Sequence, residues 1–576
     1  MPGSAEFVQR AVHTLEAGAL AIWVRRGLIL VLIIALAVFY LWNFRGLATS
    51  QAMDQAQIGR AIATGHGWRT NMIRPRAVAQ LQAHGKNAHR VYYDTYHAPL
   101  PPLIDAIALF PVKAHLTMTP ADVVFAGDKA IAAMSILLFF ASVVVLFFLA
   151  RRLFDQRLAL LACALVLLCD ALWQYSLSGL PQMLLLLFFN LTVYALARAV
   201  EARNGAGGVR IWLAAAGAGF GLLALTHALT IWMFIAALIF CVFYFRPRGW
   251  AAGIVLAAFA VLYTPWLLRN FVICGNPGGV AIYSVLDGMR HPEAGWMRHV
   301  DLGLEGIGPG ALRDKITTNL LTQSAQIFGY FGWSVVALMF FVALLHAFKR
   351  KETSALRWII LTMWAGAVMG MAVYGINEEQ GVAANQLHLI FIPLMTCYGL
   401  AFLLVQWNRL EIGFRLARIG FITLLFILCA LPMILATPWL SPWKPSVRWP
   451  PYVPPSIAVL NGWMKPEEVV ASDMPWAIAW YAGRRGLWVP VTQKTFTDFN
   501  DYQVLGGPVN GLYLTPISGT QNNLGDILKG EYRDWGPVIL RNVNLEKFPL
   551  KWATLLGLDN ECIFFSDRDR SKASSP

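Results

Sequence analysis

The chain has 576 residues, of which 57% are hydrophobic and 14% are charged, and its formal net charge is +14. A water-soluble protein of this composition would expose too much apolar surface, so a membrane protein is indicated. The excess of basic residues gives little support for nucleic-acid binding, because it is spread over short loops and does not form a patch on one soluble face.

Eleven apolar stretches are long enough to cross a bilayer, since hydrocarbon about 30 Å thick requires roughly 20 helical residues. The predicted spans are 27–44, 128–150, 157–174, 180–198, 210–226, 228–245, 250–268, 327–348, 357–375, 387–406 and 419–437. The stretch 210–245 is too long for one crossing, and a break at Thr226 and His227 divides it. The predicted fold class is therefore a polytopic α-helical membrane protein with a small α/β domain at its C-terminus.

Basic clusters in the short loops predict the orientation of these spans. The clusters are Arg25 and Arg26, Arg151 and Arg152, Arg246 and Arg248, and 349–351. All of them fall on one side under the eleven-span count, and that side is cytoplasmic by the positive-inside rule. The N-terminus is thus expected in the cytoplasm and the C-terminus outside.

Within the membrane part, 1–437, two loops are large enough to act outside the bilayer: 45–127 and 269–326. A Pro- and Trp-rich linker, 438–456, leads to a predicted α/β domain, 457–576. Its predicted strands are 467–472, 486–491, 511–516, 536–541 and 562–567, and its predicted helices are 475–484 and 523–530. Cys274 and Cys562 lie outside the spans, and a disulfide between them is left open.

Two helices are expected in the first outer loop, flat on the membrane surface. Thr49 or Ser50 can cap the first of them, and Gly65 can end it. Prolines restrict the start of the second, within 97–112, and the apolar run that follows is too short to cross.

Asp54 is the loop carboxylate best placed for catalysis. The sequence predicts it in the first turn of a helix, where the helix dipole favours an ionised carboxylate that is ready to accept a proton. The alternative is that Asp54 only stabilises the start of the helix.

The motif TPWLLRNFVICGNP indicates a phosphate-binding site. The preceding span is predicted to end at its Pro-Trp pair, so Arg269 and Asn270 emerge at headgroup depth. A planar guanidinium can grip a lipid phosphate with two hydrogen bonds, although an arginine can also reach the interface without a ligand. Glu378 and Glu379 form either a second acidic element or a solvated turn.

Five segments together resemble the C-type glycosyltransferases: AMDQAQIGRAIATGHGW, PLPPL, GLLALTHA, PWLLRN followed by GNP, and DMPWAIAWYAGRRGLWVP. Each motif alone is weak, but their order and topological side agree over the membrane part and the start of the tail. The branch most similar to this chain contains the protein O-mannosyltransferases and the lipid A aminoarabinose transferases.

The resemblance implies an enzyme that passes a sugar from a polyprenyl phosphate on the outer leaflet to an acceptor, usually with inversion. Asp54 matches the first-loop acid of this family, and Arg269 matches the arginine at the span exit. A lipid phosphate is already a fair leaving group, so the site needs cations to hold it and a base to activate the acceptor.

The chain departs from the family pattern at several positions. Gln55 stands where an acidic residue often follows the catalytic one, and Leu100 stands where a basic residue commonly precedes Pro-Pro-Leu, with His97 the nearest candidate. Relatives often carry an acidic residue at the position of Gln182 and a basic one at that of His227. The expected substrate-binding residues are Arg269, Asn270, His97, His227, Gln182, Arg60 and Glu378.

These features predict a hexosyl- or pentosyltransferase of a bacterial inner membrane, acting on the periplasmic face. Its expected partners are a polyprenyl-phosphate sugar donor, an acceptor glycan, lipid or protein, and membrane lipids. No cofactor is assigned, and the use of a divalent cation is left open. The alternatives are a lipid-linked sugar flippase or small-solute transporter, which the lack of ionisable residues near the midplane disfavours, and an O-antigen ligase or polymerase.

Overall fold

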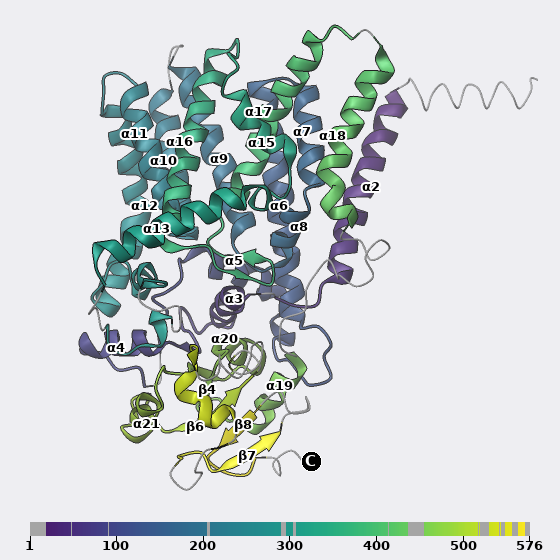
Figure 1. Ribbon diagram of the computed structural model, residues 1–576. Coiled ribbons are helices and arrows are strands. Elements are labelled where there is room, and N and C mark those ends of the chain that lie inside the picture. Colours follow the sequence, from purple (N-terminus) through teal and green to yellow (C-terminus); the bar gives the residue numbers. More distant parts are fainter. Residues whose placement is uncertain are drawn as a thin grey trace, which may run out of the picture.

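A bundle of long helices forms one end of the molecule and a small mixed sheet forms the other (Figure 1). The computed structural model describes residues 19–47, 49–89, 92–203, 208–289, 295–302, 307–412, 414–435, 454–515, 518, 529–540, 542, 548–555 and 563–570. Within these residues the chain is mostly helical, as predicted.

Seven helices of the described residues are long and apolar enough to cross a membrane. They are α6 (Ala126–Leu153), α9 (Gln182–Ala202), α10 (Val209–Thr226), α12 (Trp250–Cys274), α16 (Lys351–Tyr374), α17 (His388–Arg409) and α18 (Arg415–Leu435). A pair bent by 58°, α7 (Gln156–Leu167) and α8 (Asp170–Leu177), would make an eighth span. The chain is therefore a multi-pass membrane protein, while the count of eleven spans stays a prediction.

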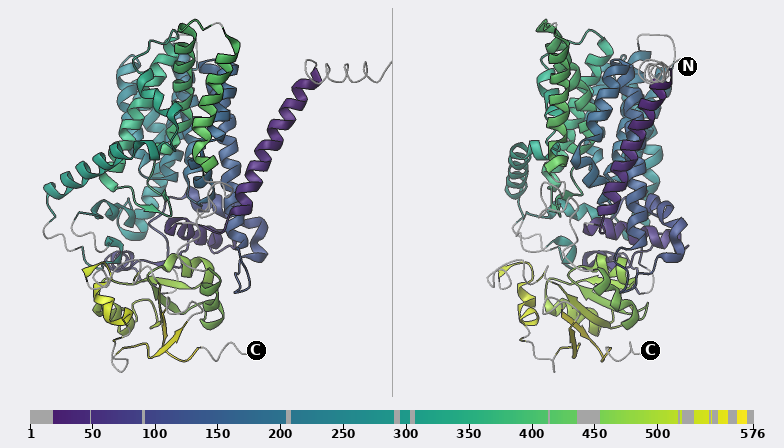
Figure 2. Two further views of the ribbon diagram at one scale, coloured as in Figure 1. Left: turned by 45° about the vertical axis from the view of Figure 1, so that its right-hand side comes forward. Right: turned by 90° about the vertical axis from the view of Figure 1, so that its right-hand side faces the viewer.

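Two further apolar stretches are shorter: α11 (Thr230–Tyr244) and Ile33–Asn43, which is the last part of α2 (Ala19–Asn43). The end of α10 and the start of α11 lie on either side of His227, where the sequence predicts a break. Figure 2 shows α2 at the margin of the bundle, with its first residue at the end of the molecule opposite the sheet.

The segment 327–348 is not the single span that its apolarity predicts. It contains α14 (Ile327–Tyr330) and α15 (Val335–Ala343), separated by a turn in which Gly332 and Trp333 have φ angles of +59° and +58°. These left-handed conformations end a right-handed helix. The nine residues of α15 extend only about 14 Å at 1.5 Å per residue, which is too short to cross.

The two outer loops contain short helices at the sheet end of the bundle (Figure 1). The first has α3 (Ser50–Ala63), β1 (Met72–Ile73), α4 (Pro75–Ala83), α5 (Leu100–Leu109) and η1 (Phe110–His115). The second has η2 (Val280–Leu286), η3 (Trp296–Arg298) and α13 (Pro309–Ala325). Between α16 and α17 lies a small hairpin, β2 (Glu378–Glu379) and β3 (Val382–Ala383).

The tail forms a mixed sheet of six strands in the order β1-β5-β4-β6-β8-β7. Its strands are β4 (Val469–Ser472), β5 (Arg485–Trp488), β6 (Val509–Leu514), β7 (Trp552–Leu555) and β8 (Ile563–Ser566). Strand β4 is parallel to β5 and β6, whereas β8 is antiparallel to β6 and β7. Strand β1 comes from the first loop and pairs in parallel with β5, with Met72 opposite Gly486.

Helices α19 (Pro454–Trp463), α20 (Pro475–Ala477), η4 (Ile478–Ala482), α21 (Gln493–Asp501) and η5 (Arg533–Trp535) surround this sheet. The prediction of a strand at 536–541 is wrong, because Gly536–Ile539 forms α24, whose proline stands at the first helical turn, where its missing N–H costs nothing. Most of the linker, most of the helix predicted at 523–530, and Cys562 lie outside the described residues.

The first loop and the tail share one hydrophobic core. Ile73 and Val78 of the first loop pack in the same buried cluster as Leu487, Phe496 and Leu512 of the tail. Together with the pairing of β1 and β5, this shared core fixes the tail against the first loop. Side chains of the tail are therefore held beside α3.

Candidate active site

Helix α3 carries Asp54 into the interior. Thr49 caps α3, since its Oγ1 accepts a hydrogen bond from the Ala52 N–H at 3.2 Å. The helix begins at Ser50, so Asp54 lies in its second turn and the prediction of a first-turn position is wrong. Close packing against α5 buries the side of the helix that carries Gly59, because a Cβ added to Gly59 would lie 2.7 Å from the Cβ of Asp105.

Asp54 belongs to a buried cluster of charged side chains. Its Oδ2 accepts a hydrogen bond from Arg74 Nη2 in an ion pair and lies 3.5 Å from His97 Nε2. A second carboxylate, Asp94, has its Oδ1 3.4 Å from His97 Nδ1 and 3.9 Å from Arg74 Nη1. None of the four residues is more than 4% exposed.

Attraction within this cluster controls its titration. Burial acts to raise the pKa of Asp94, but the charges of His97 and Arg74 and the hydrogen bonds from His97 hold that pKa at about 2. Burial acts to lower the pKa of Arg74, yet the carboxylates of Asp54 and Asp94 raise it overall. Arg74 is thus a fixed positive charge that compensates buried carboxylates.

Gln57 holds the other oxygen of the Asp54 carboxylate. One helical turn after Asp54, its Nε2 donates to Asp54 Oδ1 at 3.0 Å and to Thr70 Oγ1 at 2.6 Å. Its Oε1 accepts from the Asn71 N–H at 2.9 Å. Each oxygen of an ionised carboxylate accepts about two hydrogen bonds, so Asp54 keeps capacity for a substrate proton.

Arg269 and Asn270 lie in the last turns of α12, because the helix continues through Pro265 and does not end there as predicted. Arg269 Nη1 donates to the backbone oxygen of Asp94 at 2.5 Å and to Asn270 Oδ1 at 2.8 Å. Its Nη2 is buried with no hydrogen-bond partner among the described residues. Arg269 therefore contacts the charged cluster through the backbone of Asp94. Its second terminal nitrogen, Nη2, makes no hydrogen bond to the described residues.

A cavity of about 590 Å³ opens beside the cluster. Asp54, Arg74 and Tyr96 line it from the first loop, Asp287 lines it from the second loop, and Trp488 lines it from the tail. The volume falls within the roughly 300–1,000 Å³ of small-molecule sites, and an aromatic and polar lining is typical of them. Both large loops and the tail thus contribute to one cavity that is lined by Asp54.

Other predicted site residues lie elsewhere. Gln182 Nε2 donates to the Ala384 backbone oxygen at 2.7 Å, and His227 Nδ1 accepts from the Leu229 N–H at 3.3 Å, so both support the backbone. Glu378 lines a different cavity, between α8 and α14. Arg60 donates to the backbone oxygen of Trp480 in the tail at 2.8 Å. Of the predicted set, His97 lies beside Asp54, whereas Arg269, which is hydrogen-bonded to Asn270, reaches the cluster through the backbone oxygen of Asp94.

Sequence reasoning missed Arg74, Asp94 and Gln57. Gln57 follows Asp54 by three residues, so helical spacing alone puts the two on one face. Asp94 precedes His97 by three residues, and an acid and a histidine at that spacing are a signal for a pair. Arg74 carries no such local signal, because its partners are brought to it by the fold.

No group of three or more His, Cys, Asp and Glu side chains within the described residues is arranged to hold a metal ion. The cluster around Asp54 is instead compensated by Arg74.

Comparisons with known proteins agree on one fold. The family model for dolichyl-phosphate-mannose-protein mannosyltransferases matches residues 111–268. The structure of ArnT from Cupriavidus metallidurans bound to undecaprenyl phosphate superposes with a TM-score of 0.52 at 12% identity, covering 95% of this chain and 99% of that one. No curated protein sequence matches the chain.

The oligosaccharyltransferase of Archaeoglobus fulgidus is similar to the same degree. Its complex with Zn and sulfate gives a TM-score of 0.53 at 15% identity, covering 87% of this chain and 70% of that one. The same enzyme tethered to an acceptor peptide containing the NVT sequon gives 0.54 at 13%, covering 88% and 72%. The chain therefore has the fold of the C-type glycosyltransferases, and its residues 111–268 match the family model of the dolichyl-phosphate-mannose-protein mannosyltransferases.

Proposed function

We propose that the chain is a membrane glycosyltransferase that moves a sugar from a polyprenyl-phosphate-linked donor to an acceptor on the periplasmic face of a bacterial inner membrane. The observation that carries this proposal is the buried carboxylate of Asp54 in a cavity lined by both outer loops and the tail. The ArnT structure similar to this chain binds undecaprenyl phosphate, and the similar oligosaccharyltransferase holds an acceptor peptide, which supports a lipid-linked donor.

The chemistry follows from the charges. The acceptor nucleophile attacks the anomeric carbon while Asp54 takes its proton, and the bond from that carbon to the phosphate oxygen breaks. The polyprenyl phosphate leaves with the electron pair, and Arg269, whose Nη2 has no hydrogen-bond partner among the described residues, supplies a positive charge for its oxygens. Arg74 offsets the cost of burying the Asp54 carboxylate before the proton arrives. A single displacement of this kind inverts the anomeric centre.

The test is transfer by purified full-length protein in nanodiscs that contain a polyprenyl phosphate carrying a radiolabelled sugar. We expect the label to leave the lipid and join a membrane-extract acceptor, and Asp54→Asn to abolish this. A flippase would move the labelled lipid between leaflets without releasing the sugar. Lipid movement with no release would therefore refute the proposal.

The periplasmic side of the reaction is tested separately. A reporter that is active only in the periplasm, fused after Pro576, should be active, because the tail lines the cavity of Asp54. A cytoplasmic tail would place the reaction on the other face.

A further inference from the structure

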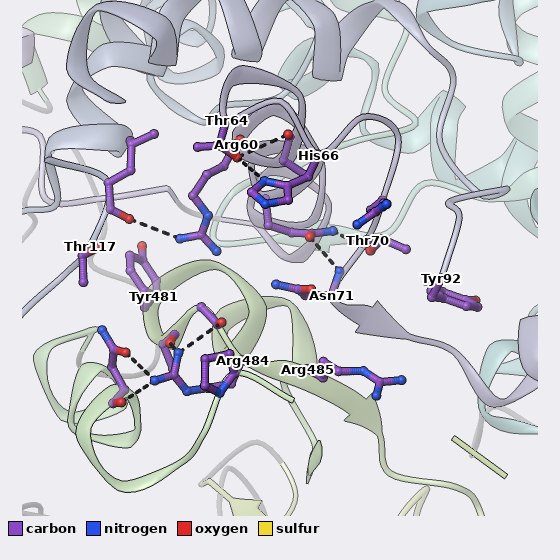
Figure 3. Close-up of a pocket in the computed structure, with 18 of the residues that line it drawn as sticks. Arg60, Thr64, His66, Thr70, Asn71, Tyr92, Thr117, Tyr481, Arg484 and Arg485 are labelled. Atoms are coloured by element: carbon purple, nitrogen blue, oxygen red, sulfur yellow. Dashed lines mark hydrogen bonds between the residues drawn. The ribbon is translucent and has the colours of Figure 1, made fainter. Parts of the chain in front are cut away.

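A second pocket, of about 500 Å³, lies between the first loop and the tail, and the charged residues of its lining are all basic (Figure 3). The cations of its lining are Arg60, Arg69, Lys113, Arg484 and Arg485, and no carboxylate belongs to the lining. Figure 3 shows Arg60 entering from α3 and Arg484 and Arg485 on the side of the tail. The tail thus completes a pocket that the first loop alone does not form.

The inner cations of this pocket are held by neutral acceptors. Arg60 donates to the backbone oxygens of Ala479 at 2.5 Å and Trp480 at 2.8 Å. Arg484 Nε donates to the Met464 oxygen at 2.8 Å, and Arg485 Nη2 donates to the Ala88 oxygen at 3.2 Å. Carbonyl oxygens fix the positions of these guanidinium groups but leave their positive charges uncompensated.

Burial and mutual repulsion make this arrangement costly without an anion. Burial, together with the charge of Arg484, lowers the pKa of Arg60 to about 10, and burial lowers the pKa of Arg485. Glu467 and Glu468 attract Arg484 from outside the lining, but Glu468 is itself paired with Arg570 at 2.7 Å. The pocket therefore keeps an excess of positive charge.

The rim supplies cations that are exposed. Arg69 and Lys113 are both exposed, and among the described residues no hydrogen bond or ion pair engages either side-chain cation. Lys113 Nζ lies 4.9 Å from the ring centre of Phe110, which leaves its three donors open to water. The pocket thus opens to solvent at a basic rim.

Gln57 and Thr70 connect this pocket to the candidate catalytic carboxylate. Both residues line the pocket, and Gln57 Nε2 donates to both Thr70 Oγ1 and Asp54 Oδ1. Asp54 itself lines the other cavity. Gln57 therefore contacts both the basic pocket and Asp54, which places the pocket next to the other cavity.

We infer that this basic pocket binds the phosphate group of the acceptor, beside Gln57 and next to the donor cavity that contains Asp54. The inference rests on the proposed glycosyltransferase function. Guanidinium forks match phosphate oxygens with paired hydrogen bonds, and five cations suit a multiply charged phosphate better than a single carboxylate. The acceptor class is thus a phosphorylated glycan or lipid.

Binding is tested without turnover, by equilibrium dialysis of labelled inorganic pyrophosphate against the full-length protein in detergent. Loss of two charge-assisted contacts in the double variant R69Q/K113Q should weaken binding about tenfold or more. The matched variant R313Q/K494Q removes one exposed arginine and one exposed lysine elsewhere and should bind as the wild type does. Equal binding by both double variants, or none by the wild type, overturns the inference.

A lipid headgroup and a soluble phosphorylated glycan present the same chemistry, and nanodiscs separate them. Loss of pyrophosphate binding in discs containing phosphatidylglycerol, but not in discs of phosphatidylcholine alone, identifies a headgroup as the occupant. Binding in both kinds of disc identifies a phosphorylated glycan. Either result supports a phosphate site.

The link to catalysis is tested by inhibition. Pyrophosphate should inhibit transfer to a membrane-extract acceptor, and R69Q/K113Q should raise the concentration for half-inhibition about tenfold. Release of donor sugar to water should not change, because the donor cavity does not include these residues. Absence of transfer by the wild type would refute the proposed function, whereas the dialysis result would still decide whether the pocket binds phosphate.

Discussion

The carboxylate cluster and the basic pocket both contact Gln57 and handle charge in opposite ways. In the cluster, Asp54 and Asp94 meet Arg74 and His97 within 3.9 Å, so opposite charges are paired inside the protein. In the pocket, the inner arginines donate their hydrogen bonds to carbonyl oxygens. The first arrangement is complete before any substrate arrives, and the second needs an anion to complete it.

The largest expected effect comes from removing the negative charge of the cluster at Asp54. Asp54→Asn keeps the size of the side chain and its contact with Gln57, but it removes the proton acceptor. Loss of a general base typically lowers the rate about 100- to 10,000-fold. We expect that loss in sugar transfer from the lipid-linked donor, with pyrophosphate binding at the basic pocket unchanged.

The matched control is Asp105→Asn, a second buried aspartate, on the neighbouring helix α5 and outside the cluster. It should keep transfer activity. Near wild-type transfer by Asp54→Asn would show that Asp54 has a structural role and that the carboxylate cluster is not the catalytic site.

Arg74 provides the next test, because it compensates two carboxylates. Arg74→Gln leaves Asp54 and Asp94 buried without their cation, and breaking a buried pair costs about 3–5 kcal/mol. Thermal unfolding in detergent should therefore shift to lower temperature. Adding Asp94→Asn removes one of the two uncompensated charges and should restore part of that stability.

Arg485→Gln is the counterpart in the basic pocket. There the removal of one cation relieves repulsion as well as breaking contacts to carbonyl oxygens, so unfolding should shift much less than for Arg74→Gln. An equal fall in unfolding temperature for Arg485→Gln and Arg74→Gln would show that the pairing of charges does not make the carboxylate cluster different from the basic pocket.

The local parts of the carboxylate site could be predicted from the sequence, whereas its long-range contacts could not. Thr49 and the helix after it follow from capping preferences, and so does the presence of Asp54 on that helix. The exact turn was predicted wrongly, since either Thr49 or Ser50 could have been the cap. Arg74 could not be found, because its pairing with Asp54 depends on the path of the chain between them.

The basic pocket was beyond prediction for a similar reason. Arg60 and Arg484 are far apart in the sequence, and their meeting depends on the short strand β1 joining the sheet of the tail beside β5. Two residues of strand carry too little pattern to be recognised. The apolar segment 327–348 shows the converse, because its composition predicted a span that the turn at Gly332 interrupts.

Substitution of Arg269 tests the binding of the lipid donor, and a smaller effect is expected. Arg269→Lys keeps the positive charge but loses the second arm of the fork, so the KM for the lipid donor should rise about tenfold with little change in kcat. The KM of the acceptor should not move. An unchanged donor KM in Arg269→Ala would return this residue to a role in anchoring the loop at Asp94.

The smallest expected effect is a pH dependence of thermal stability caused by Asp105. This buried carboxylate is paired with no cation of the carboxylate cluster or of the basic pocket among the described residues. Its Oδ2 has no partner among the described residues, and burial raises its pKa well above the ordinary value. A carboxyl whose pKa is higher in the folded than in the unfolded protein favours folding fully below the unfolded pKa, and that contribution is lost as the pH rises toward the folded pKa. The wild type should therefore unfold at a lower temperature at about pH 8 than at about pH 5, and Asp105→Asn should reduce this difference because the amide does not ionise. Thermal unfolding of both proteins at the two pH values measures the effect. An equal pH dependence in the variant would mean that groups other than Asp105 set the change in stability between the two pH values.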